Sequence, residues 1–537
     1  MDAPPPLGHR RGREAPGIGV ALAVSFAFAV SFGLNFGLGN EVSYLLAALR
    51  RLDPSLLGRD WFVTQTTQYH LVYTELGAVL LGLDKSGKLM AAVFVVLATA
   101  TGLAVYLTCR VLAGRRGALP SFFVTMAFAF AGHWRGPLMT YVFDGTLQPS
   151  GLSSAFLIGG AALFVAGRFG WSGVLLGLSG LCHLNVLILI LPAFGLAQLL
   201  LGRAGVARRL ALQLPWAAAA TLPFLPMMLR ANTPVPNAEL ARHVWIMVRL
   251  PHHFWVRGHL REFLPFCAWQ VVVAAVLWPF WRAPGEPALR RLSALLVGLA
   301  AVIWAGTLGA LASDRLTPVF SWRLIAHFIL LAELAVSVVA VRSLLEPELW
   351  TRLPRPLLPL ARAAAVTSAR PFWVTAASAL LLVNYAVGPL ARIPEHSNLL
   401  APRPTARSEL ETWMRERSPK DALFLIPPEE ETLRFRGERA VVVDWKSIPS
   451  VPNEILEWYR RISDVAGRKV EHEADLEGYD ALDPERLEAL RRRYGFDFVV
   501  VARPHAKNLA GYAARYSNAG YVVFDAERDG AKTHAAR

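Results

Sequence analysis

The first long apolar run of the chain, about residues 17–38, is followed closely by acidic side chains. Glu41 stands in the segment Asn40-Glu41-x-x-Tyr44, and Asp60 ends an amphipathic stretch further along. A carboxylate where a membrane helix meets water is costly to keep and well placed for chemistry on lipid-borne substrates. Glu41 is therefore the first candidate for a catalytic residue and Asp60 the second. The structural alternatives are a helix cap at the membrane surface for Glu41 and an interfacial anchor for Asp60.

Basic side chains that could bind a phosphate group flank later apolar runs. Arg315 and Arg323 lie on either side of one helix end, where two guanidinium groups could hold a phosphate through paired N–H donors. His252 and His253 lie in a basic, aromatic loop and could donate to a lipid phosphate. Because neighbouring histidines point in different directions, we do not expect a zinc site there. The alternative for all four is contact with lipid headgroups.

Three further polar residues are candidates for substrate binding. Asp144 and Gln148 lie in Phe143-Asp-Gly-Thr-Leu-Gln-Pro149, and His183 interrupts an apolar stretch. An unpaired histidine inside a membrane is costly, so His183 is expected to have a partner or a function. The alternative for Asp144 is a turn, because Asp-Gly pairs are common in turns.

The composition indicates a membrane protein with a soluble C-terminal domain. The chain has 537 residues, of which 54% are hydrophobic and only 18% charged, with a net charge of +15. From Glu395 onward there are 23 basic and 25 acidic residues, so the basic excess belongs to the preceding part. Such an excess in membrane loops indicates topology, and we expect no nucleic-acid partner.

The apolar runs and the basic clusters between them predict about eleven transmembrane helices. Residues 67–83 are expected to lie in the membrane interface, within a first outer loop spanning 39–87, and the 171–202 stretch to split at His183. The N-terminus is then cytoplasmic, and the C-terminal domain lies outside. The predicted crossings are 17–38, 88–110, 118–134, 151–167, 171–182, 184–202, 209–228, 263–281, 291–312, 321–341 and 373–391.

Residues 395–537 alternate between helical and strand patterns and contain no glycine-rich phosphate loop. They predict a small α/β domain, so the chain divides into a membrane domain, 1–394, and this domain. Strands are predicted at 422–426, 440–444, 496–501 and 521–524, and helices at 409–417, 453–462 and 484–493.

The motifs of the first loop resemble those of the GT-C superfamily of integral-membrane glycosyltransferases. Asn40-Glu41-x-x-Tyr44 is similar to the Asp-Glu-x-x-Tyr of its aminoarabinose and protein-mannosyl transferase branch, and Tyr69-His70-Leu71 looks like the His-Pro-Pro-Leu of that branch. In the tail, Trp413-x₅-Pro-Lys-Asp-Ala422 is similar to the start of the outer domain of oligosaccharyltransferase catalytic subunits. Asn40 replaces the first acid of the family pair, so Glu41 or Asp60 has to take over its role.

The resemblance implies an inverting glycosyltransferase that takes a sugar from a polyprenyl-phosphate carrier at the outer face of the bacterial inner membrane. The acceptor is an unidentified glycan, lipid or protein. The superfamily often keeps a second acid in the second outer loop, here Asp144, which binds the donor phosphate or a divalent cation such as Mg²⁺ or Mn²⁺. Two other functions stay open: a transporter or flippase of lipid-linked or polar substrates, using intramembrane His183 and Glu333, and a catalytically inactive membrane scaffold.

Overall fold

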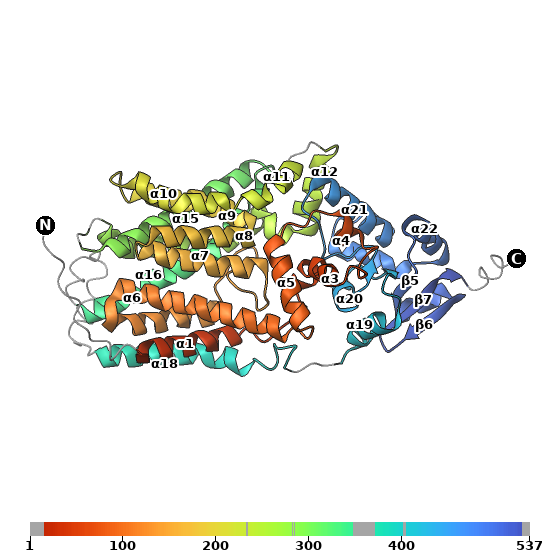
Figure 1. Cartoon of the computed structure of the whole chain (residues 1–537), viewed down its shortest axis with the longest axis horizontal. Helices are drawn as coiled ribbons and strands as arrows, with labels where there is room; N and C mark the ends of the chain where they lie inside the picture. Colours follow the sequence, from red (N-terminus) through yellow and green to blue (C-terminus); the bar gives the residue numbers. More distant parts are fainter. Residues whose placement is uncertain are drawn as a thin grey trace.

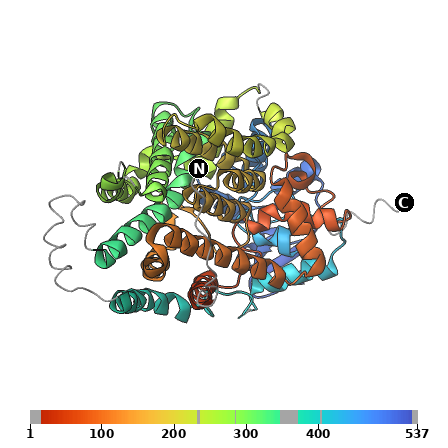
Figure 2. The same ribbon diagram turned by 60° about the vertical axis from the view of Figure 1, so that its left-hand side comes forward.

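The computed structural model describes residues 15–231, 235–281, 283, 285–346, 371–400 and 404–528. The molecule is elongated, with a bundle of long helices at one end and a smaller domain containing a β-sheet at the other (Figure 1). Short helices of the segment after α1 (Ala15–Val30) lie between these two parts, as Figures 1 and 2 both show. We call the end of the bundle that faces the sheet domain the domain-bearing end.

The bundle is that of a multi-pass membrane protein. Among the described residues, six helical stretches are long and apolar enough to cross a membrane, and five further apolar helices are shorter. Most of their bounds follow the predicted crossings, since helix length and hydropathy are set locally by the sequence, but α1 ends at Val30, earlier than the predicted 17–38. After α1, the helices are α6 (Lys88–Gly132), α7 (Pro149–Val165), α8 (Phe169–Cys182), α9 (Leu184–Leu200), α10 (Val206–Ala219), α11 (Leu225–Ala231), α14 (Leu264–Leu277), α15 (Pro287–Ala312), α16 (Ile325–Leu345) and α18 (Pro371–Ala391).

The two crossings predicted at 88–110 and 118–134 are two helices that meet at a kink, and together they carry the label α6. Its backbone is non-helical only at Gly114, where φ is 64° and ψ −172°. A residue without a Cβ adopts this conformation at little cost, so one glycine replaces the loop that the sequence suggested. Arg115 and Arg116 follow directly after this kink.

Close packing between the short helices depends on small residues. Helix α8 packs against α10 with Gly173 and Gly177 at the contact. A Cβ on Gly173 would lie 2.6 Å from the carbonyl oxygen of Gln213, and one on Gly177 would lie 2.7 Å from that of Trp216. Small residues at four-residue spacing let helix backbones approach closely, which supplies much of the packing energy inside a membrane.

The segment between α1 and α6 folds into four helices. They are α2 (Glu41–Tyr44), α3 (Leu46–Leu52), α4 (Trp61–Gln65) and α5 (Leu71–Leu83). Helix α5 matches the predicted interfacial segment and packs against α3, while α2 contacts the C-terminal domain through α20 (Thr432–Arg436). This segment, residues 31–87, is called the first loop below.

The C-terminal domain contains a five-stranded sheet in the order β4-β3-β5-β7-β6. The edge strand β4 (Ala440–Val441) and its neighbours β3 (Leu423–Leu425) and β5 (Phe498–Ala502) run parallel, and β7 (Tyr521–Arg528) pairs antiparallel with β5 and with β6 (Tyr512–Ser517). Helices α19 (Ala406–Arg417), α21 (Pro452–Ala466) and α22 (Pro484–Tyr494) complete the α/β fold. Strand β6 was not predicted, because most of its residues are exposed or half-buried and carry no apolar run.

Replacing Gly173 with leucine is expected to separate α8 from α10. The added side chain has no room beside the backbone of Gln213, so we expect a loss of about 2 kcal/mol in unfolding free energy, seen as a lower Tm in detergent. Gly170→Leu is the matched control, because a Cβ at Gly170 meets nothing within 4 Å. Equal Tm values for the two variants would contradict the close packing.

Candidate functional site

Glu41 lies at the centre of a polar cluster at the domain-bearing end of the bundle. It begins α2, and its side chain is fully buried. Its Oε2 accepts a hydrogen bond from the backbone N–H of Gly37 at 2.7 Å, and its Oε1 accepts one from Leu147 at 3.1 Å. One carboxylate therefore ties the first loop to the loop that precedes α7.

Burial raises the pKa of the Glu41 carboxyl to about 8. The nearby charge of Asp144 raises it further, while the hydrogen bonds from Gly37 and Leu147 oppose the shift because they favour the charged form. A carboxyl group whose pKa lies near neutral pH is suited to exchanging a proton with a substrate.

Asp144 and Gln148 lie beside Glu41 and connect it to Asn40. The Asp144 carboxylate accepts hydrogen bonds from the N–H and hydroxyl of Thr146, each at 3.2 Å, and one from the Gln148 side-chain amide. The Gln148 carbonyl accepts from the Asn40 amide at 3.1 Å. Asn40, which stands where the resembling family has its first acid, thus hydrogen-bonds to Gln148. Glu41 and Asp144 are the carboxylates of the cluster.

Aromatic side chains from the first loop form one wall of the cluster. The Tyr73 hydroxyl donates to the carbonyl of Leu147 at 2.5 Å, and the Tyr44 ring lies 4.5 Å from the imidazole of His70. The rings of His70 and His183 are 5.3 Å apart. Desolvation lowers the pKa of His70 to about 3, so this imidazole is neutral at physiological pH.

Arg323 supplies the positive charge of the cluster. It lies in a short turn, η6 (Ser321–Leu324), at the start of α16, and its Nη1 is 2.6 Å from Nε2 of His183. Its guanidinium lies over the ring of Phe320, and its charge lowers the phenol pKa values of Tyr44 and Tyr141 against the larger effect of burial. His183 therefore has the partner that an intramembrane histidine needs.

His252 and His253 lie at the edge of this cluster. The Nδ1 of His253 is 3.1 Å from the carbonyl oxygen of Leu138, and its own carbonyl accepts from the Trp322 indole N–H at 2.8 Å, next to Arg323. Burial lowers the pKa of His252 to about 4, and the charges of Arg249 and Lys446 lower it further.

Two predicted site residues lie elsewhere. Arg315 is largely exposed and pairs with Glu239 at 3.7 Å, so it does not face Arg323 in a joint clamp. Asp60 is fully buried, caps α4 and contacts the C-terminal domain through Val441 and Arg434. Neither side chain contacts Glu41, and this geometry favours a structural role for Asp60.

Arg249 of the membrane domain meets Trp445 of the C-terminal domain, a contact that the sequence did not predict. Arg249, in the π-helical turn η2 (Val244–Arg249), donates to the carbonyl of Trp445 at 2.6 Å, and its guanidinium lies over the Trp445 indole ring at 5.1 Å. Lys446 follows Trp445 directly in the chain. Two features of the sequence could have pointed to this contact: Arg249 ends an apolar stretch, and the later segment with Trp445 and Lys446 is aromatic and basic.

The carboxylates of the cluster do not form a divalent-cation site. Within the residues that the structure describes, no group of three or more His, Cys, Asp or Glu side chains is arranged to hold a metal ion. Both Glu41 oxygens accept backbone N–H groups, and Asp144 accepts from Thr146 and Gln148. Since Mg²⁺ and Mn²⁺ require several free oxygen ligands, this donor set does not fit either ion, and Asp144 is better suited to bind substrate hydroxyl groups.

Comparisons with known proteins agree with this fold. The chain is similar to the crystal structure of ArnT from Cupriavidus metallidurans bound to undecaprenyl phosphate, with a TM-score of 0.53 and 15% identity over 95% of this chain and 97% of that one. The apo-state structure of ArnT matches over the same shares with 13% identity and a TM-score of 0.49. A family described as a domain of unknown function (DUF6798) matches residues 406–465, and no curated protein sequence matches the chain. The chain therefore shares the fold of the undecaprenyl-phosphate-bound structure, in agreement with the architecture predicted from the resemblance to the GT-C superfamily.

The raised pKa of Glu41 predicts a pH dependence of stability. The native state holds this proton up to about pH 8, whereas the unfolded chain releases it near its ordinary value of 4.5. The stabilisation is complete below pH 4.5 and lost as the pH rises to 8. Between pH 6 and 8 we expect a loss on the order of 2 kcal/mol in unfolding free energy, seen as a falling Tm. Glu41→Gln should remove this dependence of Tm on pH, and Glu75→Gln, at an exposed position, should keep it. Equal dependence of Tm on pH in the two variants would contradict the assignment of the effect to Glu41.

Proposed function

We propose that this chain is a membrane glycosyltransferase that moves a sugar from a polyprenyl-phosphate carrier to an acceptor, with Glu41, Asp144 and Arg323 in its active site. One observation carries the proposal: Glu41 and Arg323, 282 positions apart in the chain, share neighbours in the polar cluster, since Asp144 acts on the pKa of both Glu41 and Tyr141, and Arg323 acts on the pKa of Tyr141. The fold is shared with a protein crystallised with undecaprenyl phosphate, which supports the choice of donor carrier.

In this reaction, the acceptor oxygen forms a bond to the anomeric carbon of the sugar while the bond from that carbon to the phosphate oxygen breaks. Glu41 takes the proton of the acceptor hydroxyl in its ionised form, which a pKa of about 8 makes the minor form at neutral pH, and the lipid phosphate leaves with the bonding electron pair. Arg323 stabilises the charge that develops on the phosphate, because a guanidinium pairs strongly with phosphate oxygens. No nucleotide is needed, since the lipid phosphate is the leaving group.

The other side chains of the cluster take supporting roles. His183 contacts Arg323 and holds its guanidinium toward the cluster, while His252 and His253 line the approach of the lipid phosphate. Asp144 and Gln148 bind hydroxyl groups of the sugar or acceptor. Asp144 is half-buried beside fully buried Glu41, so a bound acceptor reaches Glu41 past it.

The location follows from the same arrangement. A polyprenyl-phosphate sugar lies in the bilayer, and the cluster lies where the helical bundle meets the C-terminal domain. The basic residues of the loops at the opposite end, read with the positive-inside rule, support a location of the C-terminal domain outside the bacterial inner membrane. The acceptor, a glycan, lipid or protein, then arrives from that side.

Arg323 and Arg315 give a matched test of donor binding. We expect undecaprenyl phosphate to raise the Tm of the purified protein, and Arg323→Met to reduce this rise strongly because the phosphate loses its guanidinium partner. Arg315→Met should keep the full rise, since Arg315 is exposed and away from the cluster. A Tm rise that depends on Arg315, or on neither arginine, would contradict the assigned phosphate site.

Glu41→Gln tests the catalytic role. A strain lacking the gene is expected to lose a sugar from its envelope lipids or glycans, as measured by mass spectrometry, and the wild-type gene to restore it. The Glu41→Gln gene should fail to restore it, with a rate loss on the order of 100-fold or more from removing the base. Glu75→Gln, on the exposed face of α5, should restore it fully. An unchanged envelope profile in the deletion strain would favour the transporter or the scaffold.

A further inference from the structure

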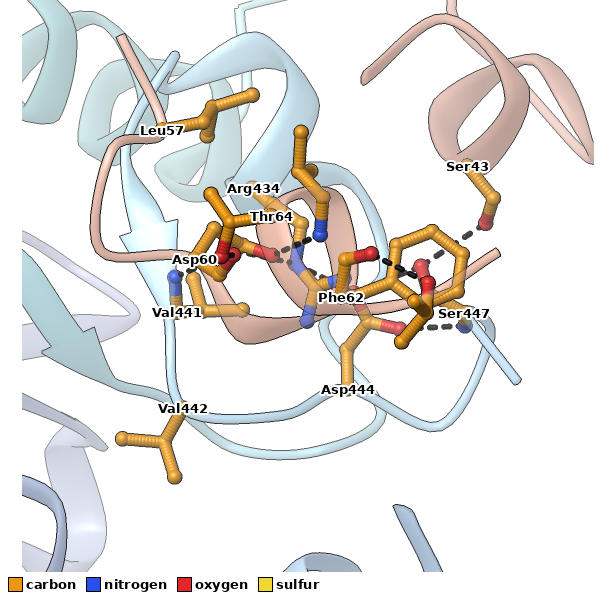
Figure 3. Close-up of polar contacts among 12 residues, drawn as sticks. Ser43, Leu57, Asp60, Phe62, Thr64, Arg434, Val441, Val442, Asp444 and Ser447 are labelled. Carbon is orange, nitrogen blue, oxygen red and sulfur yellow. Dashed lines mark hydrogen bonds and ion pairs between the residues drawn. The ribbon is translucent and has the colours of Figure 1, made fainter. Parts of the chain in front are cut away.

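A buried arginine of the C-terminal domain joins that domain to the first loop. Arg434 lies in the short helix α20, and only 2% of its side chain is exposed. Its Nε is 3.3 Å from Oδ2 of Asp60 and 3.2 Å from Oδ2 of Asp444, so one guanidinium lies between two buried carboxylates (Figure 3). Phe62 covers this group at 5.5 Å. We call Asp60, Arg434 and Asp444 the interdomain triad.

Asp60 connects the triad to backbone on both sides of the interface. Its Oδ1 accepts from the N–H of Val63 at 3.1 Å, which caps α4, and its Oδ2 accepts from the N–H of Val441 at 3.0 Å, at the edge of the sheet (Figure 3). A buried carboxylate is tolerated only where its charge and lone pairs are matched in this way. The first loop is therefore fixed to strand β4.

Asp444 connects the triad to the helix that carries Glu41. It accepts hydrogen bonds from the N–H of Ser447 at 2.6 Å and from its hydroxyl at 3.2 Å. The Ser447 hydroxyl is also 3.0 Å from that of Ser43 (Figure 3). Ser43 lies in α2, two residues after Glu41. Polar contacts therefore connect Arg434 to α2 through Asp444 and Ser447.

A second arginine of α20 supports the other side of Glu41. Arg436 donates to the carbonyl oxygens of Phe36 at 2.8 Å and Gly37 at 3.3 Å. The N–H of Gly37 is the group that donates to Oε2 of Glu41. Helix α20 thus holds the chain both before and after Glu41.

We propose that α20 is a positioning element for Glu41, with Arg434 as its main positioning residue. The proposal deepens the function proposed above and rests on it for the catalytic consequence. It also gives a role to part of the region matched by the family of unknown function, residues 406–465, which contains the whole of α20. The C-terminal domain then acts as a support for the active site.

The docking of α20 can be measured without any substrate. In the full-length protein with its three cysteines, Cys109, Cys182 and Cys267, replaced by alanine, Ser43→Cys and Ser447→Cys place two thiols where the hydroxyls are 3.0 Å apart. This pair should form a disulfide on mild oxidation. Arg434→Met should lower the yield of cross-linked protein severalfold, because it leaves two buried carboxylates unpaired. Arg417→Met, an exposed arginine of the same domain, should leave the yield unchanged.

The catalytic consequence has its own readout. With the native cysteines, Arg434→Met should lower kcat for sugar transfer on the order of 100-fold while the Tm rise with undecaprenyl phosphate persists, since Arg323 is untouched. In the cysteine-substituted protein, closing the disulfide between the two introduced thiols should restore part of the activity to the Arg434→Met variant, which loss of folding alone would not allow.

Arg436→Met is the second variant if Arg434→Met does not fold, because Arg436 is half-buried and its loss leaves the triad intact. It should lower kcat while keeping the cross-link. Unchanged cross-linking and unchanged kcat in Arg434→Met would overturn the positioning role. If the wild-type protein transfers no sugar, the proposed function fails, whereas the cross-linking result still decides whether α20 holds the helix of Glu41.

Discussion

Burial of carboxylates at the junction of two domains is the constraint on which this structure depends. Glu41, Asp60 and Asp444 are almost completely inaccessible to water, and each would be strongly unfavourable without matched donors. The protein satisfies them with backbone N–H groups and with one arginine, all supplied within or between the first loop, the loop before α7 and the C-terminal domain. The helical bundle, the first loop and the C-terminal domain must therefore be correctly assembled before any of these charges is stable.

The same constraint separates two kinds of carboxylate that look alike in the sequence. Among the described residues, no arginine acts on the pKa of Glu41, which rises to about 8 through burial, a value that suits proton exchange with a substrate. Asp60 caps a helix, pairs with Arg434 and accepts from Val441, which leaves it no oxygen directed at a substrate. Chemical role follows from the partners of each side chain, not from its position at the end of an apolar run.

The C-terminal domain is more closely integrated with the bundle than an accessory domain would be. It contacts the first loop through α20, reaches Arg249 through Trp445, and pairs Asp497 with Arg59 at 2.6 Å. Such interdomain contacts, made from buried and charge-assisted hydrogen bonds, hold one geometry rather than allow sliding. The C-terminal domain holds the short helix α2, which carries Glu41, because it supplies the rigidity that a helix of four residues lacks.

The sequence by itself determined the membrane character of this protein, the approximate bounds of its helices and most strands of its C-terminal domain. Those properties depend on local hydropathy and on the spacing at which apolar residues recur, and both are set by residues close together in the chain. It also pointed to Glu41, Asp144, Gln148, His183 and Arg323, because polar groups at the ends of membrane helices are costly and few. Only the tertiary structure decided that these side chains meet, that Asp60 and Arg315 lie elsewhere, and that Arg434 stands between Asp60 and Asp444. Asp60 and Arg434 are 374 positions apart, and a pairing over that separation is fixed by the packing of whole domains, which no local pattern encodes.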